Sequence, residues 1–229
     1  MASPAPGMNR FYLLLGAVAL AGIAWLVYQI GKPSGVSIPV NVTVLAADTA
    51  GFRGYLAGSP DAPVEVSEFA DFQCPACENF ETIQFPAVQQ QLISSGQVRW
   101  RYRDFPLEMH PHARVASHAA ACANEQNKFW EMKQVIYGRQ TEWSPVRNAA
   151  SKFSDYAKEV GLDVGQYDEC MKSARFAGRI QASVDEGKKL GVTGTPTFLI
   201  GGQLYPWTSA LGSDSIRVLV RALLPKPTQ

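Results

Sequence analysis

Apolar and polar residues alternate along two stretches of the chain in the manner of β-strands. Residues 64–69 (VEVSEF) and 98–103 (VRWRYR) show the period of two that places successive side chains on opposite faces of a sheet. Residues 197–200 (TFLI) predict a third strand, and Gly201-Gly202 predicts a turn into a fourth at 203–205. The arginines of 98–103 are most simply the solvated side of their strand; a basic patch that faces a substrate is the alternative.

Elsewhere the apolar residues recur at intervals of three and four, which indicates helices. A helix from Pro75 is expected to kink at Pro86 and to stop at Gly96, and a last helix starts at Ser213 or Asp214. Between about residues 107 and 190 no strand is expected. The helical stripes there contain Ala116, Ala119, Ala120 and Ala123; Phe129, Trp130, Met132, Val135 and Ile136; Phe153, Tyr156, Ala157 and Val160; Val164, Tyr167, Cys170 and Met171; and Phe176, Ile180, Val184 and Leu190. The pattern predicts an α/β domain with a helical insertion.

The N-terminal part of the chain is different. Residues 11–30 (FYLLLGAVALAGIAWLVYQI) carry no formal charge and are long enough to cross a bilayer as one helix. We therefore expect a short cytoplasmic N-terminus at 1–10, a transmembrane signal anchor at 11–30 and a linker at 31–57 that contains one short strand at 40–45. Arg10 before the run, together with the α-amino group, gives a small positive-inside bias over Lys32. A cleaved signal peptide is the alternative, although its apolar region is normally shorter.

Composition narrows the function further. The 229 residues contain 46% hydrophobic and 18% charged residues, with a formal net charge of +1. A globular domain of this composition can bury a core. The near-neutral charge gives no electrostatic reason to expect a nucleic-acid partner.

The candidate chemistry lies in Cys74-Pro75-Ala76-Cys77, where the first strand pattern gives way to a helix. Cys74 would be the N-cap residue and Pro75 the first helical residue, so the free N–H groups of the helix would face the first sulfur. Those groups favour a thiolate and should lower the pKa of Cys74. Cys74 is then the nucleophile, and Cys77 is the thiol that resolves a mixed disulfide. Half of a zinc site has the same spacing, so the motif alone leaves metal binding open.

Glu68 is a second candidate catalytic residue. It shares one face of its strand with Val64 and Val66, six residues before Cys74. If it is buried beneath the sulfurs, its pKa should be raised and it could relay the proton of Cys77. The alternative is a bent strand that lets Glu68 reach solvent.

Two further cysteines and three histidines lie in the helical region. Cys122 and Cys170 have apolar neighbours, and in an exported protein they could form a structural disulfide that closes a loop of 48 residues by subtraction (170 minus 122). The chain-entropy model assigns such a bridge on the order of 3–4 kcal/mol. Two buried free thiols are the alternative. For His110, His112 and His118 we expect packing rather than metal binding, because no third ligand has a clear spacing.

The motifs together resemble the DsbA-like branch of the thioredoxin superfamily, and in particular its membrane-anchored, BdbD-like members. The resemblance covers about residues 58–224 and rests on GSPDAPVEVSEFADFQCPAC, DFPLEMHPHARVASHAAACANEQNKFWEM and GVTGTPTFLIGG. It implies a thioredoxin-like fold with the helical insertion at 107–190. Pro225 and Pro227 end the ordered part of the sequence and leave a tail at 225–229. The resemblance also implies a cis peptide bond at Pro196 facing the sulfurs, with Thr195 offering backbone hydrogen bonds to a substrate. Glu68 corresponds to the buried acid of the family, and Cys122 and Cys170 correspond to a pair found in only some relatives.

The chain departs from the best-known oxidases of this family in its dipeptide. Pro75-Ala76 stands where those oxidases have a histidine in second place, and the missing imidazole argues for a less oxidising site. Thr195 occurs in oxidase, isomerase and reductase relatives and leaves the direction open.

The sequence therefore predicts an extracytoplasmic oxidoreductase that introduces disulfide bonds into exported proteins. Its expected partners are cysteine-containing substrates, a quinone-linked integral membrane reoxidase and the membrane itself, with the C-terminal domain on the periplasmic or cell-envelope side. No cofactor is implied. The alternatives are an isomerase or reductase on the same fold, and a metal-binding or thiol-trapping chaperone module.

Overall fold

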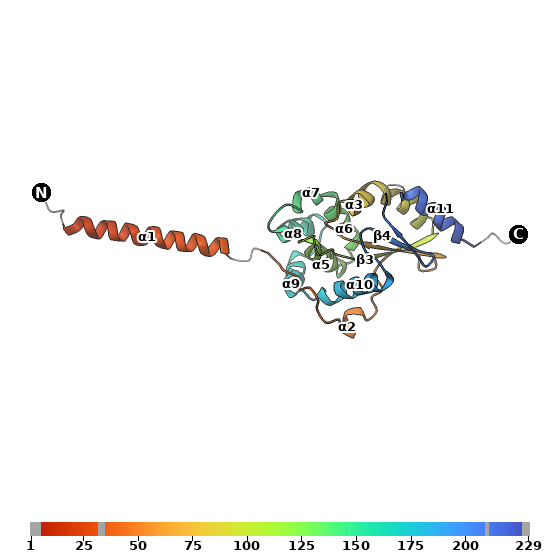
Figure 1. The fold of residues 1–229 in the computed structure, drawn as a ribbon, viewed down its shortest axis with the longest axis horizontal. Helices are drawn as coiled ribbons and strands as arrows, with labels where there is room; N and C mark the ends of the chain where they lie inside the picture. The colour runs from red at the N-terminus through yellow and green to blue at the C-terminus, as the bar shows by residue number, and fades with distance from the viewer. Residues whose placement is uncertain (1–5, 32–34, 209–210, 226–229) are drawn as a thin grey trace. The chain divides into compact units, whose positions relative to one another are not determined.

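The computed structural model describes residues 6–31, 35–208 and 211–225 (Figure 1). The chain divides into two compact units, Met1–Ser34 and Gly35–Gln229. The first contains helix α1 (Pro6–Gly31), which includes the apolar run expected to span a membrane. Within the described residues, however, no helix combines the length and the apolar character that a membrane crossing requires. Residues 1–5 of the expected N-terminal segment and 226–229 of the expected tail lie outside the described residues.

In the described part of the second unit, five strands form one mixed sheet in the order β1-β3-β2-β4-β5. Strands β2 (Val64–Ala70) and β3 (Val98–Asp104) are parallel, and the other pairs are antiparallel. The remaining strands are β1 (Tyr55–Ala57), β4 (Thr197–Ile200) and β5 (Gln203–Pro206). The alternation in the sequence therefore predicted strands β2 and β3 correctly.

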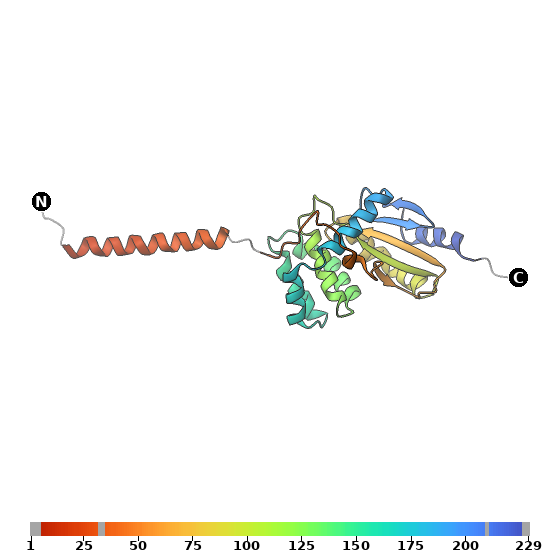
Figure 2. The ribbon, with the colours of Figure 1, turned by 90° about the horizontal axis from the view of Figure 1, so that it is seen from below.

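Helices cover both faces of this sheet (Figures 1 and 2). Helix α3 (Pro75–Asn79) leads into the layer on one face, where Phe80, α4 (Phe85–Val88) and α11 (Ser213–Leu223) pack in a cluster that includes Val66, Trp100 and Phe198. The other face packs against α10 (Ala177–Leu190) through Phe69, Phe105 and Val184. The expected kink at Pro86 takes the form of π-helical turns at Phe80–Gln84 and Gln89–Ile93, on either side of α4. Pro86 is the second residue of α4, directly after the first of these π-helical turns, which accommodates the missing N–H.

The helical insertion forms a second apolar core beside the sheet. Two boundaries of its helices lie where the sequence predicts them. Asp163 caps the start of α9, where its side chain accepts a hydrogen bond from the Gln166 N–H at 3.0 Å, and Gly191 ends α10 with a φ of +94°. Its other helices are α5 (Ala113–Asn124), α6 (Phe129–Gly138), α7 (Gln140–Trp143), α8 (Ala149–Glu159) and α9 (Val164–Ser173).

Two details of the segment before β2 differ from expectation. The short strand expected at 40–45 is absent; that segment lies outside regular structure and leads into a single turn, α2 (Ala46–Thr49). Much of the segment expected to be a linker, from Gly35 onward, also belongs to the second compact unit: Ile38 is 5% exposed, and β1 pairs with β3. One apolar side chain and three paired residues are enough to hold this segment, but too few to produce a periodic signal in the sequence.

The arginines of β3 also differ from the expected solvated row. Arg99 pairs with Glu65 at 2.7 Å, and Arg101 pairs with Glu186 of α10 at 2.8 Å. Arg103 is 5% exposed and pairs with the same Glu186. A buried or half-buried guanidinium requires an opposite charge nearby, and these carboxylates provide it within the domain. The arginines of β3 therefore give no support to a basic patch that faces a substrate.

Candidate active site

Cys74 occupies the N-cap position of α3, with Pro75 as the first helical residue. Its backbone is extended (φ −74°, ψ 123°), and its N–H donates to the Asp71 carbonyl oxygen at 3.1 Å. The Gln140 side chain donates to the Cys74 carbonyl oxygen at 3.1 Å and so ties the turn to α7. The backbone of Cys74 is therefore held at the start of a helix through both its N–H and its carbonyl oxygen.

The sheet brings a second loop to the same place. Because β2 and β4 are antiparallel, with Phe69 opposite Thr197, the end of β2 lies beside the start of β4. The residues just before β4 are Thr195 and Pro196, joined by a cis peptide bond. The Cys74 thiol lies 3.4 Å from the Thr195 carbonyl oxygen. The structure thus unites CPAC and the Thr-Pro loop, which are more than a hundred residues apart in the chain.

The two sulfurs have opposite electrostatic environments. The Cys77 thiol donates a hydrogen bond toward Cys74 and, with the backbone N–H groups of Ala76 and Cys77, lowers the pKa of Cys74 to about 6 despite partial burial. Cys77 is completely buried, and this burial raises its own pKa well above the ordinary value. The Asp71 N–H donates to the Cys77 sulfur at 3.4 Å. Cys74 is therefore a thiolate at neutral pH, whereas Cys77 stays protonated.

Glu68 is fully buried, so the bent-strand alternative does not describe this domain. Its Oε2 accepts a hydrogen bond from the Trp100 indole at 2.9 Å. Burial raises its pKa well above the ordinary value, and the neighbouring Glu81 carboxylate raises it further. The hydroxyls of Tyr102 and Tyr137 bond to each other at 2.9 Å, and both lie in the electrostatic field of Glu68 and of Cys77. The tyrosine pair is thus coupled electrostatically to both the acid and the buried sulfur.

A comparison with known families identifies the domain. The family model described as Thioredoxin matches residues 53–217, which is most of the chain. The chain belongs to the thioredoxin family.

Similar proteins agree with this assignment. The thioredoxin-family domain is 28% identical over 150 residues to the probable disulfide bond formation protein D of Bacillus anthracis. This match covers 64% of this chain and 69% of that protein. Its fold matches that of oxidised BdbD from Bacillus subtilis with a TM-score of 0.66 and 23% identity, over 73% of this chain and 91% of that one. The resemblance to the DsbA-like and BdbD-like branch is confirmed.

A higher identity links the domain to one part of a longer protein. It is 38% identical over 154 residues to Na(+)/H(+) antiporter NhaA 3 of Salinispora tropica, over 67% of this chain. The matched region is 22% of that antiporter, and a Salinispora arenicola antiporter is matched over 33% of its length. The chain thus spans a third or less of these relatives.

The thioredoxin-family domain also contains polar residues near the site that the sequence did not indicate. Lys133 of α6 is 2% exposed, pairs with Glu81, and lies 4.0 Å from the centre of the Phe85 ring. Lys133 and Glu81 line a groove of about 990 Å³ between α4 and α6. Lys133 and Glu81 both lie in helical segments, where a charged side chain is normally solvated. Only the tertiary structure shows that their side chains are buried and act on Glu68.

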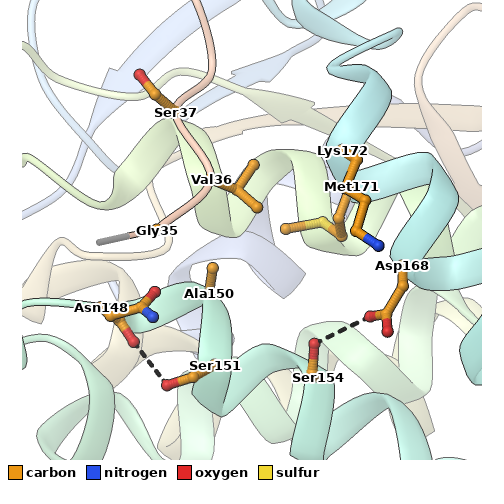
Figure 3. Close-up of a pocket in the computed structure, with 10 residues that line it drawn as sticks. All are labelled: Gly35, Val36, Ser37, Asn148, Ala150, Ser151, Ser154, Asp168, Met171 and Lys172. Carbon is orange, nitrogen blue, oxygen red and sulfur yellow. Dashed lines mark hydrogen bonds between the residues drawn. The ribbon is translucent and has the colours of Figure 1, made fainter. Parts of the chain in front are cut away.

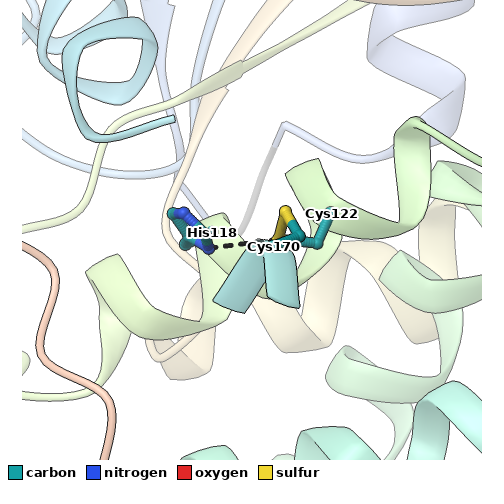
Figure 4. Close-up of side chains that lie close together, drawn as sticks. All are labelled: His118, Cys122 and Cys170. Atoms are coloured by element: carbon teal, nitrogen blue, oxygen red, sulfur yellow. Dashed lines mark hydrogen bonds between the residues drawn. A yellow bond between two sulfur atoms is a disulfide. The ribbon is translucent and has the colours of Figure 1, made fainter. Parts of the chain in front are cut away.

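The second pair of cysteines lies in the helical core, where a disulfide joins Cys122 and Cys170 (Figure 4). His118 Nδ1 lies 3.3 Å from the Cys122 sulfur, and burial lowers the pKa of His118 to about 4. These three residues form the one group of at least three closely spaced potential metal ligands found among the described residues. Because its two sulfurs are bonded to each other, the group offers no thiolate to a metal.

A separate cavity of about 530 Å³ lies between residues 35–37 and helices α8 and α9 (Figure 3). Ser154 donates a hydrogen bond to Asp168 at its edge. None of the candidate catalytic residues lines this cavity, so it is distinct from the site at Cys74.

Proposed function

We propose that this chain is an extracytoplasmic thiol–disulfide oxidoreductase that introduces disulfide bonds into exported proteins through Cys74 and Cys77. The main support is the pairing of a low-pKa sulfur, which keeps 7% of its residue surface exposed, with a fully buried, high-pKa one beside the Thr195-Pro196 loop. A low-pKa thiol is both a reactive nucleophile and a good leaving group in disulfide exchange.

The reaction begins with the pair oxidised. A substrate thiolate attacks the Cys74 sulfur, which breaks the Cys74–Cys77 bond, forms a mixed disulfide and releases Cys77 as a thiolate. A second substrate thiolate then attacks the substrate sulfur of the mixed disulfide and releases Cys74 as a thiolate. The substrate loses two electrons and gains a disulfide, and the enzyme pair is reduced. In the reverse direction Cys77 attacks the mixed disulfide and releases the substrate.

Glu68 has the role of a proton relay in this scheme. The thiolate released at Cys77 is buried and must take up a proton, because burial raises its pKa. Glu68 is held in its protonated form by burial and by Glu81, and the Tyr102–Tyr137 hydroxyl pair lies near both Glu68 and Cys77. A proton passing from Glu68 through these hydroxyls would neutralise Cys77. Thr195 would hold the substrate through its backbone while exchange takes place.

The oxidase direction is supported by the pKa of Cys74, which is lowered to about 6. A lower thiol pKa stabilises the reduced form and makes the disulfide a stronger oxidant. Values of about 7 for thioredoxin and about 3.5 for DsbA bracket this one. An isomerase or reductase on the same fold is the second candidate because of this intermediate value, and the reduction potential of the pair distinguishes the two directions.

An extracytoplasmic location is supported by the Cys122–Cys170 disulfide, since structural disulfides persist in oxidising compartments. Membrane attachment through residues 11–30 is part of the proposal and is supported by the uncharged run in the sequence. Because the reduced pair must be reoxidised after each turnover, the proposal includes a membrane reoxidase linked to quinone.

Two single substitutions test the mechanism. Cys74→Ser should abolish oxidation of a reduced model protein, because it removes the attacked sulfur. Cys77→Ser, presented with a protein that contains disulfides, should accumulate mixed disulfides at Cys74, visible on a non-reducing gel, because the buried thiol that would attack the mixed disulfide is gone. Cys122→Ala/Cys170→Ala is the control and should retain oxidation in the folded fraction. Activity equal to that of wild type in either active-site variant would refute the mechanism.

A further inference from the structure

Asp71 connects the CPAC turn to the loop between β3 and α5. Its carbonyl oxygen accepts the Cys74 N–H at 3.1 Å, and its own N–H donates to the Cys77 sulfur at 3.4 Å. Its Oδ1 accepts the Gln73 N–H at 2.7 Å. The backbone of this one residue therefore contacts both cysteines of the pair.

The other carboxylate oxygen of Asp71 holds the loop between β3 and α5. Oδ2 accepts the Leu107 N–H at 2.8 Å and lies 2.7 Å from His110 Nδ1. Asp71 is completely buried, whereas 18% of the His110 side chain is exposed. A buried carboxylate requires a donor or a cation, and His110 provides one. The contact fixes Nδ1–H toward Asp71 and thereby orients the ring.

We propose that His110, positioned by Asp71, provides at the Cys74 thiolate the positive charge that the dipeptide Pro75-Ala76 lacks. The inference rests on the proposed redox role of Cys74 and adds a residue from a loop more than thirty positions away in the chain. His110 acts on the sulfur through its charge, and Asp71 acts as the positioning residue.

The electrostatics of the loop agree with this arrangement. The hydrogen bond from Asp71 raises the pKa of His110, and the negative charge of Cys74 adds to the effect. Coupling between two titrating groups is reciprocal, so an imidazolium that is stabilised by the thiolate also stabilises the thiolate. Asp71 and Cys74 are the acidic groups that act on the ring, and Cys77 is the ionisable group that acts most strongly on Cys74.

The first test measures the thiol titration of Cys74 from its thiolate absorbance in the reduced protein. His110→Gln retains an N–H donor for Asp71 but removes the charge, and it should raise the pKa of Cys74 by about one pH unit. The equilibrium with glutathione should then become less oxidising by at most about tenfold, which corresponds to about 30 mV. His110→Lys, which retains a charge, should restore much of the difference.

The matched control is His112→Gln. His112 lies two residues further on and provides its backbone N–H to Gln73. The loss of its imidazole should leave the Cys74 titration unchanged. A pKa shift as large as that of His110→Gln would show a diffuse effect of loop charge and would overturn the inference, as would an unshifted Cys74 in a folded His110→Gln protein.

A reciprocal measurement does not depend on any His110 variant. In Cys74→Ser, the imidazole of His110 followed by NMR should titrate at a lower pH than in the reduced wild type, because the neighbouring anion is gone. An unchanged His110 titration contradicts the inference. Neither titration requires oxidase activity, so the failure of this inference can be told apart from a failure of the proposed function.

Discussion

At the scale of single residues, the site is built from groups whose charge is set by burial. Cys77 and Glu68 are both fully buried and both held in their neutral forms, whereas Cys74 keeps a 7% exposed surface and ionises. The sequence identified these three residues because a CxxC motif and a strand period are local patterns. It did not identify Glu81, Lys133 or His110 as neighbours of the site, because each comes from a segment whose proximity depends on the tertiary fold.

Glu68→Gln should slow disulfide exchange by about tenfold or more, because the relay loses its proton. Relative to wild type, the same variant should become more stable as the pH rises. The folded pKa of Glu68 is raised above the unfolded value of about 4.3, so its contribution to stability is complete below that value and is lost as pH rises toward the folded pKa. Glutamine does not titrate, so the free energy of unfolding of the variant should fall less than that of wild type between pH 5 and pH 8.

Stopped-flow exchange and urea unfolding at pH 5 and pH 8 measure both effects. Glu65→Gln is the control: it makes the same chemical change on the opposite face of β2, at a partly exposed carboxylate paired with Arg99. It should leave the exchange rate unchanged. Unchanged exchange in Glu68→Gln across this range would remove the relay role of Glu68.

At the scale of elements, the helical insertion was largely predictable and the sheet edge was not. Helices α5, α6, α8, α9 and α10 each carry a continuous apolar stripe, and cap residues such as Asp163 and Gly191 mark their ends. Strand β1 has only three residues, which is too short for alternation to be recognised. The burial of Arg103 was also unpredictable, because its partner Glu186 lies 83 residues further along the chain.

The bridge between α5 and α9 should stabilise the insertion. Removing it with Cys122→Ala/Cys170→Ala should lower the free energy of unfolding by about 3–4 kcal/mol, because the unfolded chain regains the freedom of the 48-residue loop. Urea unfolding without reductant measures the difference. Wild type unfolded in the presence of reductant should approach the variant. Peptide mapping that finds both thiols free to react with an alkylating agent in the native state would exclude the bridge.

The packing of α10 on the sheet depends on Gly187. A methyl group at this position would lie 2.6 Å from the Phe105 ring and 3.1 Å from the Phe69 ring. Gly187→Ala should therefore destabilise the domain by about 1–3 kcal/mol through overpacking. Gly138→Ala in α6 is the control, since a methyl group there would meet no atom within 4 Å. Thermal unfolding of the two variants should move in opposite directions or differ by several degrees; equal shifts would contradict this account of the contact.

At the scale of the whole molecule, the proposed function depends on the compartment in which the domain folds. A fusion of the full chain to a reporter enzyme that is active only after export should be active. The fused protein should also remain with membranes after alkaline washing if residues 11–30 anchor it, and should be released if they do not. A reporter that is active only in the cytosol, fused at the same C-terminus, is the control. Activity of the cytosolic reporter alone would refute the extracytoplasmic location.

The structural disulfide and the active-site pair of this chain must be oxidised at different stages of folding. Cys122 and Cys170 are at most 1% exposed, so their bond must form before the helices of the insertion close around it. The newly made chain cannot supply that oxidation from its own active site, because the site is assembled only when the same domain has folded. A protein proposed to donate disulfides would therefore itself need an oxidant, such as an already folded copy or another donor, to form its Cys122–Cys170 bond.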